Sequence, residues 1–402
     1  MKGGFRLASL SLVQETQQNL WDATNFREPK KVPVGMEFTY WPFSYAGVTY
    51  KEVAHDPQLT AEKYLQFLDD IHLDYTWGMA SLPNPYKAFQ ALGSNSFFLA
   101  NDQTTVAHNQ TADVYMEDDE YDEFSKDPYY FINEILLKRK LPKLDQGRKE
   151  AAYGALRQSM LEFRHFDLTN ELILQGLAER AVYTLVNAPI VFNSPLKLLF
   201  DKVRGMKNTL IDLRRRPDKV RAACAQLLAA DKAAIPLKPE DLAKMPGLKV
   251  GLTGYHVECF LSGKQFDEFF MKPFLEVCEP YMQAGVKFFL KGEGKFLNTI
   301  ERYRQTPKGS MIIMLEEDDP FEVHKLVGDW CTLATGISAS LLKYGTKQQC
   351  IDYVKKCYDT FAPGGGFIFM QDRPLLSAND ANPENIIAVY EFANEYGKNK
   401  KG

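Results

Sequence analysis

The sequence predicts a (β/α)₈ barrel, also called a TIM barrel, on three observations. Short apolar segments alternate with longer helical patterns between residues 32 and 370. Most of the apolar segments are continuous runs, which is typical of parallel strands that are buried on both faces. A doubly wound open sheet is the runner-up, but the chain has no GxGxxG motif after its first strand and no phosphate-binding P-loop. The alternation therefore favours the barrel.

Each element rests on its own pattern. The predicted strands are 32–38, 73–79, 188–193, 248–254, 286–292, 310–316, 331–337 and 366–370. The helical segments between them are amphipathic, as in 57–71, 262–283 and 345–361, and Thr346 is a suitable N-cap for the last of these. We expect a single barrel domain over residues 1–402, preceded by a helical extension at 1–31.

The segment 101–150 does not follow this rhythm. It contains the acidic stretch "YMEDDEYDEFSKDP" and then the basic "LKRKLPKLDQGRK". A βα connection rarely needs so many residues, so we interpret the segment as an insertion near the barrel mouth. It is either a solvated charged loop or a lid that faces a substrate or a partner.

Composition excludes several classes of protein. The formal charge is -4 and the basic residues are dispersed, so we expect no nucleic-acid partner. No apolar run approaches the ~20 residues of a membrane span, and the N-terminus lacks a signal-peptide pattern. The six cysteines have no metal-finger spacing. We expect a cytoplasmic protein with reduced thiols and no membrane partner.

Charged and polar side chains follow several predicted strands, where a barrel carries its chemistry. They include Glu37, Trp77, Asn193, His256, Glu258, Lys291, Glu293 and Asp372. One interpretation is a divalent metal such as zinc, with His256, Glu258, Glu293 and Asp372 as candidate ligands. The other is acid–base chemistry without metal by Lys291 and Glu293. These alternatives stay open, as does a purely structural His256.

The C-terminal third carries a family resemblance. The run "GTKQQCIDYVKKCYDTFAPGGGFIF" followed by "NPENIIAVYEFANEYG" resembles the uroporphyrinogen decarboxylase superfamily. Upstream, "EPKKVPVGMEF" and "EDDEYDEFSKDPYYFI" are similar to its corrinoid-dependent methyltransferase branch, especially the members that serve O-demethylation. The resemblance extends over nearly the whole chain. It implies a barrel fold and an enzyme that moves a methyl group.

Two motifs differ from those of the superfamily, and each difference limits the reactions that the resemblance implies. The arginine-rich motif that clamps propionates is replaced by "GMEFTYWPF", which argues against porphyrinogen decarboxylation. The His-x-Cys zinc ligands after the fifth strand are replaced by Lys291-Gly292-Glu293, and the cysteine after the eighth by Gln371-Asp372. Glutamate and lysine in place of thiolate ligands suit an oxygen substrate better than a sulfur substrate.

The resemblance implies a methyltransferase that demethylates a methoxylated aromatic compound. Cobalamin would arrive on a separate corrinoid protein, because the chain lacks the Asp-x-His-x-x-Gly motif that binds it. His256, Glu258, Lys291 and Glu293 are the candidate catalytic residues. The candidate substrate-binding residues are Glu37, Tyr40, Trp41, Phe43, Trp77, Asn193 and Asp372.

Three alternatives are carried with this interpretation. The aromatic residues near position 40 are either the walls of a ring pocket or ordinary core. The chain is either a methyltransferase, a decarboxylase acting on a carboxylated ring, or a non-catalytic barrel subunit. A homodimer is an open alternative to a monomer.

Overall fold

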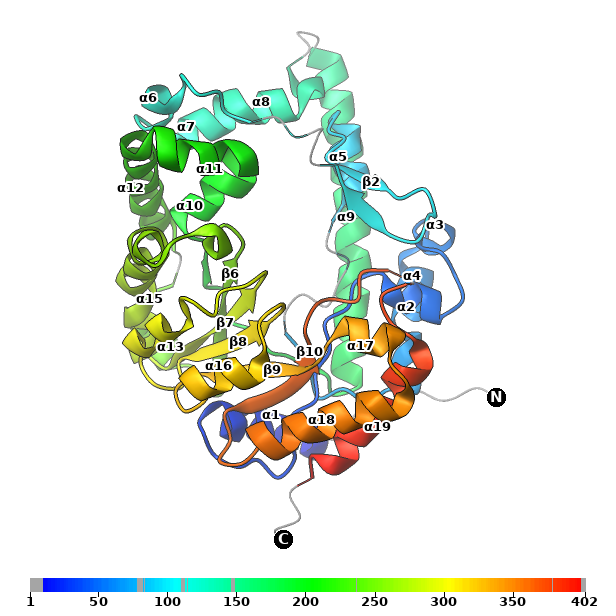
Figure 1. Cartoon of the computed structure of the whole chain (residues 1–402). Coiled ribbons are helices and arrows are strands. Elements are labelled where there is room, and N and C mark those ends of the chain that lie inside the picture. The colour runs from blue at the N-terminus through cyan, green and yellow to red at the C-terminus, as the bar shows by residue number, and fades with distance from the viewer. Residues whose placement is uncertain are drawn as a thin grey trace.

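The computed structural model describes residues 10–77, 82, 84–109, 113, 115–145, 149–235, 237–377 and 379–398. It is a mixed α/β structure in which a parallel sheet is flanked by helices (Figure 1). Further helices rise from the sheet and meet above it in an arch that is visible at the top of Figure 1. Among the described residues, no helix has the length and apolar character needed to cross a membrane.

The main sheet has six parallel strands in the order β10-β9-β8-β7-β6-β5. Its strands are β5 (Val191–Phe192), β6 (Lys249–Tyr255), β7 (Val286–Gly292), β8 (Met311–Leu315), β9 (Thr332–Ile337) and β10 (Phe367–Gln371). The last five confirm the predicted strands to within a residue at each end. Their apolar runs are buried on both faces, so the pattern alone was sufficient to locate them.

The first three predicted strands are shorter than expected. Within 73–77, the described part of the predicted strand 73–79, only β1 (Tyr75–Thr76) is a strand, and it pairs with β4 (Tyr183–Thr184), which the sequence did not indicate. Within 188–193 only β5 is extended, and 32–38 forms isolated bridges, including Val34 with Phe369 and Gly35 with Tyr75. The amides of Asn187 and Ala188 both donate to the carbonyl of Val250, at 3.0 and 2.9 Å. Two donors on one acceptor interrupt the ladder as a bulge does, which separates β4 from β5.

Helices follow the strands, and several of them cover the outer face of the sheet (Figure 1). Those that follow β5 are α10 (Pro195–Leu198), α11 (Met206–Arg215), α12 (Pro217–Ala234), α13 (Pro239–Ala243), α14 (Gly263–Phe266), α15 (Lys272–Gln283), α16 (Pro320–Val327), α17 (Ala339–Tyr344), α18 (Lys347–Phe361) and α19 (Pro383–Tyr396). Thr346 caps α18 in a capping box, as predicted. The predicted helix 262–283 is divided into α14 and α15 by a π-helical turn at Asp267–Met271.

A compact cluster of buried apolar side chains, here called the enclosed cluster, packs between the main sheet, β1 and α1. It contains side chains from alternate strand positions together with two from α1 (Leu10–Thr24): Leu20, Ala23, Tyr75, Leu185, Val250, Phe289, Ile312, Met314, Ala334, Ile368 and Met370. Lys287 joins α1 to β7, because its ammonium donates to the carbonyls of Thr24 at 2.9 Å and Gly309 at 2.5 Å. Burial lowers the pKa of Lys287 to about 8. The helical extension thus packs under the sheet.

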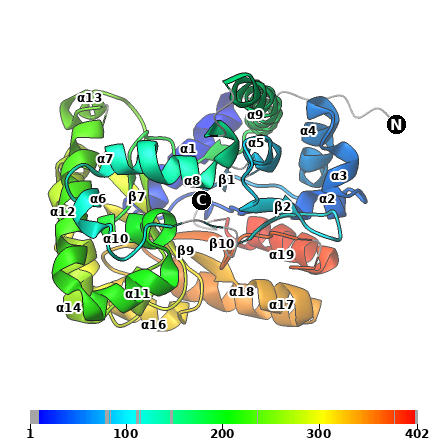
Figure 2. The ribbon, with the colours of Figure 1, turned by 90° about the horizontal axis from the view of Figure 1, so that it is seen from above.

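The N-terminal half supplies the side of the molecule next to β1. It contains α2 (Trp41–Tyr45), α3 (Tyr50–Val53), α4 (Pro57–Leu65), α5 (Tyr86–Ala91) and an antiparallel hairpin of β2 (Phe97–Leu99) and β3 (Val106–His108). The predicted helix 57–71 therefore ends earlier than expected, and a 3₁₀ turn at Gln66–Asp69 follows it. The long helix α9 (Lys149–Glu179) lies at the edge of the molecule, as the view from above shows (Figure 2).

The described part of 101–150 is folded and not a loose loop. It forms α6 (Tyr121–Phe124), α7 (Pro128–Tyr130) and α8 (Leu137–Lys140), which build the top of the arch (Figure 1). Tyr121, Phe124 and Phe131 are fully buried in the main core. Arg139 pairs with Glu120 at 2.6 Å, and Arg216 at the start of α12 pairs with Asp118. Ion pairs and aromatic anchors therefore hold the acidic stretch against the rest of the protein.

Candidate active site

The carboxyl ends of β6 and β7 bring the main charged groups together. Gly254 pairs with Lys291 and Tyr255 with Gly292 in the parallel register. Lys291 lies two positions after Phe289, whose side chain belongs to the enclosed cluster, so both side chains are on the same face of β7. Lys291 thus extends from the enclosed core toward the rim of the sheet.

Lys291 is held between two carboxylates. Its Nζ lies 3.1 Å from Oε1 of Glu37 and 3.5 Å from Oε1 of Glu293. Burial alone would lower the pKa of Lys291, but the two carboxylates outweigh burial and raise it. Burial raises the pKa of Glu37, which is 5% exposed, and Lys291 offsets this only in part. The structure therefore stabilises a protonated Lys291 beside a carboxylate that water barely reaches.

An aromatic surface adjoins this group of charges. The indole of Trp77 stacks on the ring of Phe289 with 5.5 Å between centroids and 9° between planes. The ammonium of Lys291 lies 5.5 Å from the centroid of the Trp77 ring. Trp77 is only partly buried. The contacts of Lys291 with Glu37, Glu293 and Trp77 bring these four sequence-predicted residues together in one place.

The loop after β7 is fixed by the loop after β8. The amide of Gly294 donates to Glu316 at 2.8 Å, and the amide of Phe296 donates to Asp318 at 2.7 Å. Gly294 has a φ of +77°, and a side chain there would meet Cys259 at 3.3 Å. The second glycine of "FFLKGEGKF" is thus required by the backbone conformation that follows Glu293.

A histidine–aspartate pair forms a second part of the site. Nδ1 of His256 lies 2.6 Å from Oδ1 of Asp201, and Asp201 also pairs with Lys197. The hydrogen bond to Asp201 raises the pKa of His256, and the charge of Glu293 acts in the same direction. Sequence reasoning missed Asp201 and Lys197, because they lie within the helical segments after β5 and not directly at the end of the predicted strand. Their i, i+4 spacing was the one available signal.

Glu258, one of the predicted catalytic residues, lies in a buried and hydrogen-bonded position. It is 1% exposed, accepts a hydrogen bond from Ser194 at 2.5 Å and accepts the amide of His256 at 2.8 Å. Burial raises its pKa. Glu258 therefore holds the His256 loop against the loop after β5 through a buried carboxylate.

The other predicted substrate-binding residues differ in their burial and contacts. Tyr40, Trp41 and Phe43 are at most 2% exposed and pack in the core beside α4, so the core alternative is correct and they line no open pocket. Asn193 is half-buried after β5. Asp372 accepts the amide of Ala339 at 2.9 Å, and burial raises its pKa to about 6.

The residues present do not fit a metal site. Among the described residues, no group of three or more His, Cys, Asp or Glu side chains is arranged to hold a metal ion. Of the four expected ligands, His256, Glu258 and Asp372 are each engaged by a different protein partner, and Glu293 lies 3.5 Å from the ammonium of Lys291. No step of the chemistry below is therefore assigned to a metal.

The fold and site define an α/β protein with a charged, partly aromatic centre at the carboxyl edge of a parallel sheet. No family model matches the chain, and no curated protein matches it in sequence. Its fold is similar to that of solved structures, among them a methyltransferase from Methanosarcina mazei. That structure has a TM-score of 0.55 and 15% sequence identity, over 95% of this chain and 98% of the other. At this identity the likeness is one of fold.

Proposed function

We propose that this protein is a methyltransferase that takes a methyl group from an aryl methyl ether and delivers it to the reduced corrinoid of a separate protein. The observation that carries the proposal is a pair of cationic acids, Lys291 and His256, each held by a carboxylate, with the ammonium of Lys291 over the ring of the partly buried Trp77. The likeness in fold to a methyltransferase supports it. So do the sequence motifs that resemble the corrinoid-dependent branch.

The proposal includes the fold: we propose that the strands close into a (β/α)₈ barrel. The bridges Val34–Phe369 and Gly35–Tyr75 would join β10 to β1 through 32–38. The hydrogen bonds of Asn187 and Ala188 to Val250 would join β4 to β6. The enclosed cluster, with side chains from alternate positions, is the layered core that such a barrel requires.

The chemistry assigned to this chain is assistance to a poor leaving group. The methyl–oxygen bond breaks with its electron pair moving to oxygen, and the corrinoid of the partner supplies the nucleophile that receives the methyl carbon. A proton delivered to the ether oxygen turns the product into a neutral phenol. His256 is the proton donor in this proposal, because Asp201 fixes its Nδ1 and leaves Nε2 available. Lys291 places a fixed positive charge beside the forming oxyanion.

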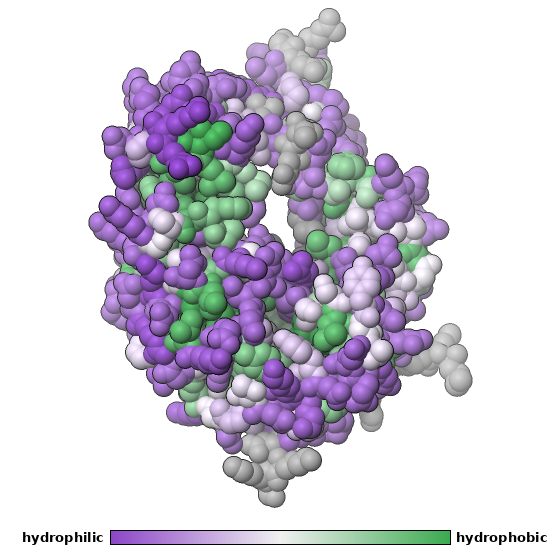
Figure 3. All heavy atoms as spheres, in the orientation of Figure 1, coloured by the Kyte–Doolittle hydropathy of each residue, from purple (hydrophilic) through white to green (hydrophobic). Residues whose placement is uncertain are grey.

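Access is consistent with a large partner. Figure 3 shows an opening at the centre of this face of the molecule, and in Figure 1 the strand ends point toward that region. The charged rim of the sheet would then be reachable from outside beneath the arch. The folded 101–150 segment would form part of the docking surface for the corrinoid protein.

The test is spectroscopic. Co(I) corrinoid protein is mixed with this protein and a panel of methoxyarenes, and the absorbance of methyl-Co(III) is followed. We expect methylation with the native chain, a severe loss with His256→Ala and with Glu293→Gln, and no loss with the exposed-histidine control His55→Gln. The absence of methyl-Co(III) absorbance with every methoxyarene of the panel refutes the proposal. Carbon dioxide release without cobalt identifies the decarboxylase alternative, and a stable complex without turnover identifies a non-catalytic subunit.

A further inference from the structure

An unpartnered apolar stripe runs along the outer face of α9. The large hydrophobic side chains Tyr153, Leu156, Met160, Leu161 and Leu168 are 69, 41, 63, 56 and 37% exposed. The buried residues of the same helix, Ser159, Thr169, Ile173, Gly176 and Leu177, lie on the opposite side at the helical period. A helix of 31 residues is about 46 Å long, so the stripe occupies the first two-thirds of a long, accessible rod.

Charged residues flank the stripe without partners of their own. Arg157 and Asp167 are both exposed, and within the described part of the chain neither takes part in an ion pair. By contrast, Arg164 pairs with Glu171 of the same helix at 3.0 Å. An exposed arginine and aspartate on one apolar face are what a self-complementary interface would use.

We infer that α9 is the interface of a homodimer in which two copies of the helix pack antiparallel about a two-fold axis. An isologous interface requires that each residue faces its counterpart in both directions. With the axis between residues 160 and 164, Leu156 faces Leu168 and Arg157 faces Asp167. Met160 faces Arg164, whose aliphatic stem covers the thioether. A single register therefore satisfies both the apolar and the charged positions, twice in each dimer.

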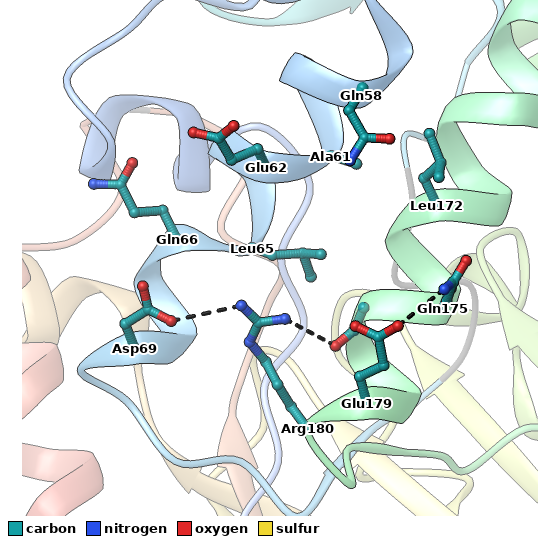
Figure 4. A pocket seen from close by; sticks show the side chains of 11 residues that line it. Gln58, Ala61, Glu62, Leu65, Gln66, Asp69, Leu172, Gln175, Glu179 and Arg180 are labelled. Atoms are coloured by element: carbon teal, nitrogen blue, oxygen red, sulfur yellow. Dashed lines mark hydrogen bonds and ion pairs between the residues drawn. The ribbon is translucent and has the colours of Figure 1, made fainter. Parts of the chain in front are cut away.

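A groove at the end of the stripe extends the same register. It lies between α4 and α9 and has a volume of about 620 Å³ (Figure 4). Its lining includes the carboxylates of Glu62, Asp69 and Glu179, and Arg180 lies 3.5 Å from Asp69. In the antiparallel register, Gln175 of this groove faces Lys149 at the start of the second helix. The ammonium of Lys149 in one copy would thus be placed against the carboxylates that line the groove of the other.

Charge reversal tests the inference directly. Molar mass is measured by light scattering after gel filtration for the full chain, with circular dichroism to check folding. We expect a dimer for the native chain, a monomer for Arg157→Glu and for Met160→Glu, and a restored dimer for Arg157→Glu/Asp167→Arg. The control Lys355→Glu, on the exposed face of α18, should stay dimeric.

Two outcomes overturn the inference. A native chain that is monomeric at tens of micromolar removes the interface altogether. A dimer that persists in both Arg157→Glu and Met160→Glu places the contact elsewhere on the molecule. Because the measurement needs no substrate or corrinoid, its result is independent of the proposed function.

Discussion

Replacement of Lys291 by methionine should destabilise the protein in a pH-dependent way. The change leaves Glu37, which is 5% exposed, without the ammonium that lies 3.1 Å from its carboxylate. Removing one partner of a buried ion pair costs about 3–5 kcal/mol. The side chain of Lys291 keeps 25% exposure, so we expect the lower end of this range, about 3 kcal/mol at pH 8.

The sign of the pH dependence follows from Glu37. Burial already raises the pKa of Glu37, and loss of Lys291 raises it further. When the pKa of a carboxyl group is higher in the folded state than in the unfolded state, the free energy of unfolding falls as the pH rises from the unfolded pKa to the folded pKa. The destabilisation by Lys291→Met should therefore be large at pH 8 and should shrink toward pH 5, where Glu37 takes up a proton.

The assay is urea unfolding followed by tryptophan fluorescence at pH 5 and pH 8. The double variant Glu37→Gln/Lys291→Met has no charge at either of these two positions, so it should recover about 2 kcal/mol at pH 8 while remaining inactive. The control Lys355→Met breaks an exposed pair with Asp359 and should have little effect. Equal stability of Lys291→Met and the control at pH 8, or a cost that grows on acidification, would refute the reasoning.

Three further predictions concern the neighbouring residues. Asp201→Asn replaces the carboxylate that raises the pKa of His256 by a neutral amide, so the pH at which methyl transfer declines should move lower, as a pH–rate profile would show. Gly292→Ala places a Cβ 2.6 Å from the carbonyl of Met314 and should cost about 1–3 kcal/mol in thermal or urea unfolding. Lys287→Met leaves buried carbonyls without a donor, so it should cost about 1–3 kcal/mol and speed hydrogen exchange in α1, whereas unchanged exchange would contradict its role.

The sequence by itself determined the elements whose pattern is strong and local. The strands β6 to β10 are continuous apolar runs, and α18 has a capping box that can be recognised from Thr346 and Gln349. Lys291 and Glu293 were placed at a strand end because the strand is long and its last residue is clear. These features depend on neighbours within a few positions along the chain.

Tertiary structure decided which charges meet and which are enclosed. Asp201 reaches His256 from a helical segment 55 positions away, and no periodicity indicates such a contact. Glu258 and the aromatic residues at 40–43 are residue types that are common in functional sites, but tertiary packing buries their side chains. The burial of a side chain is set by every element that covers it. The same residue types are therefore buried in the core at one strand end and form part of the candidate site at the next.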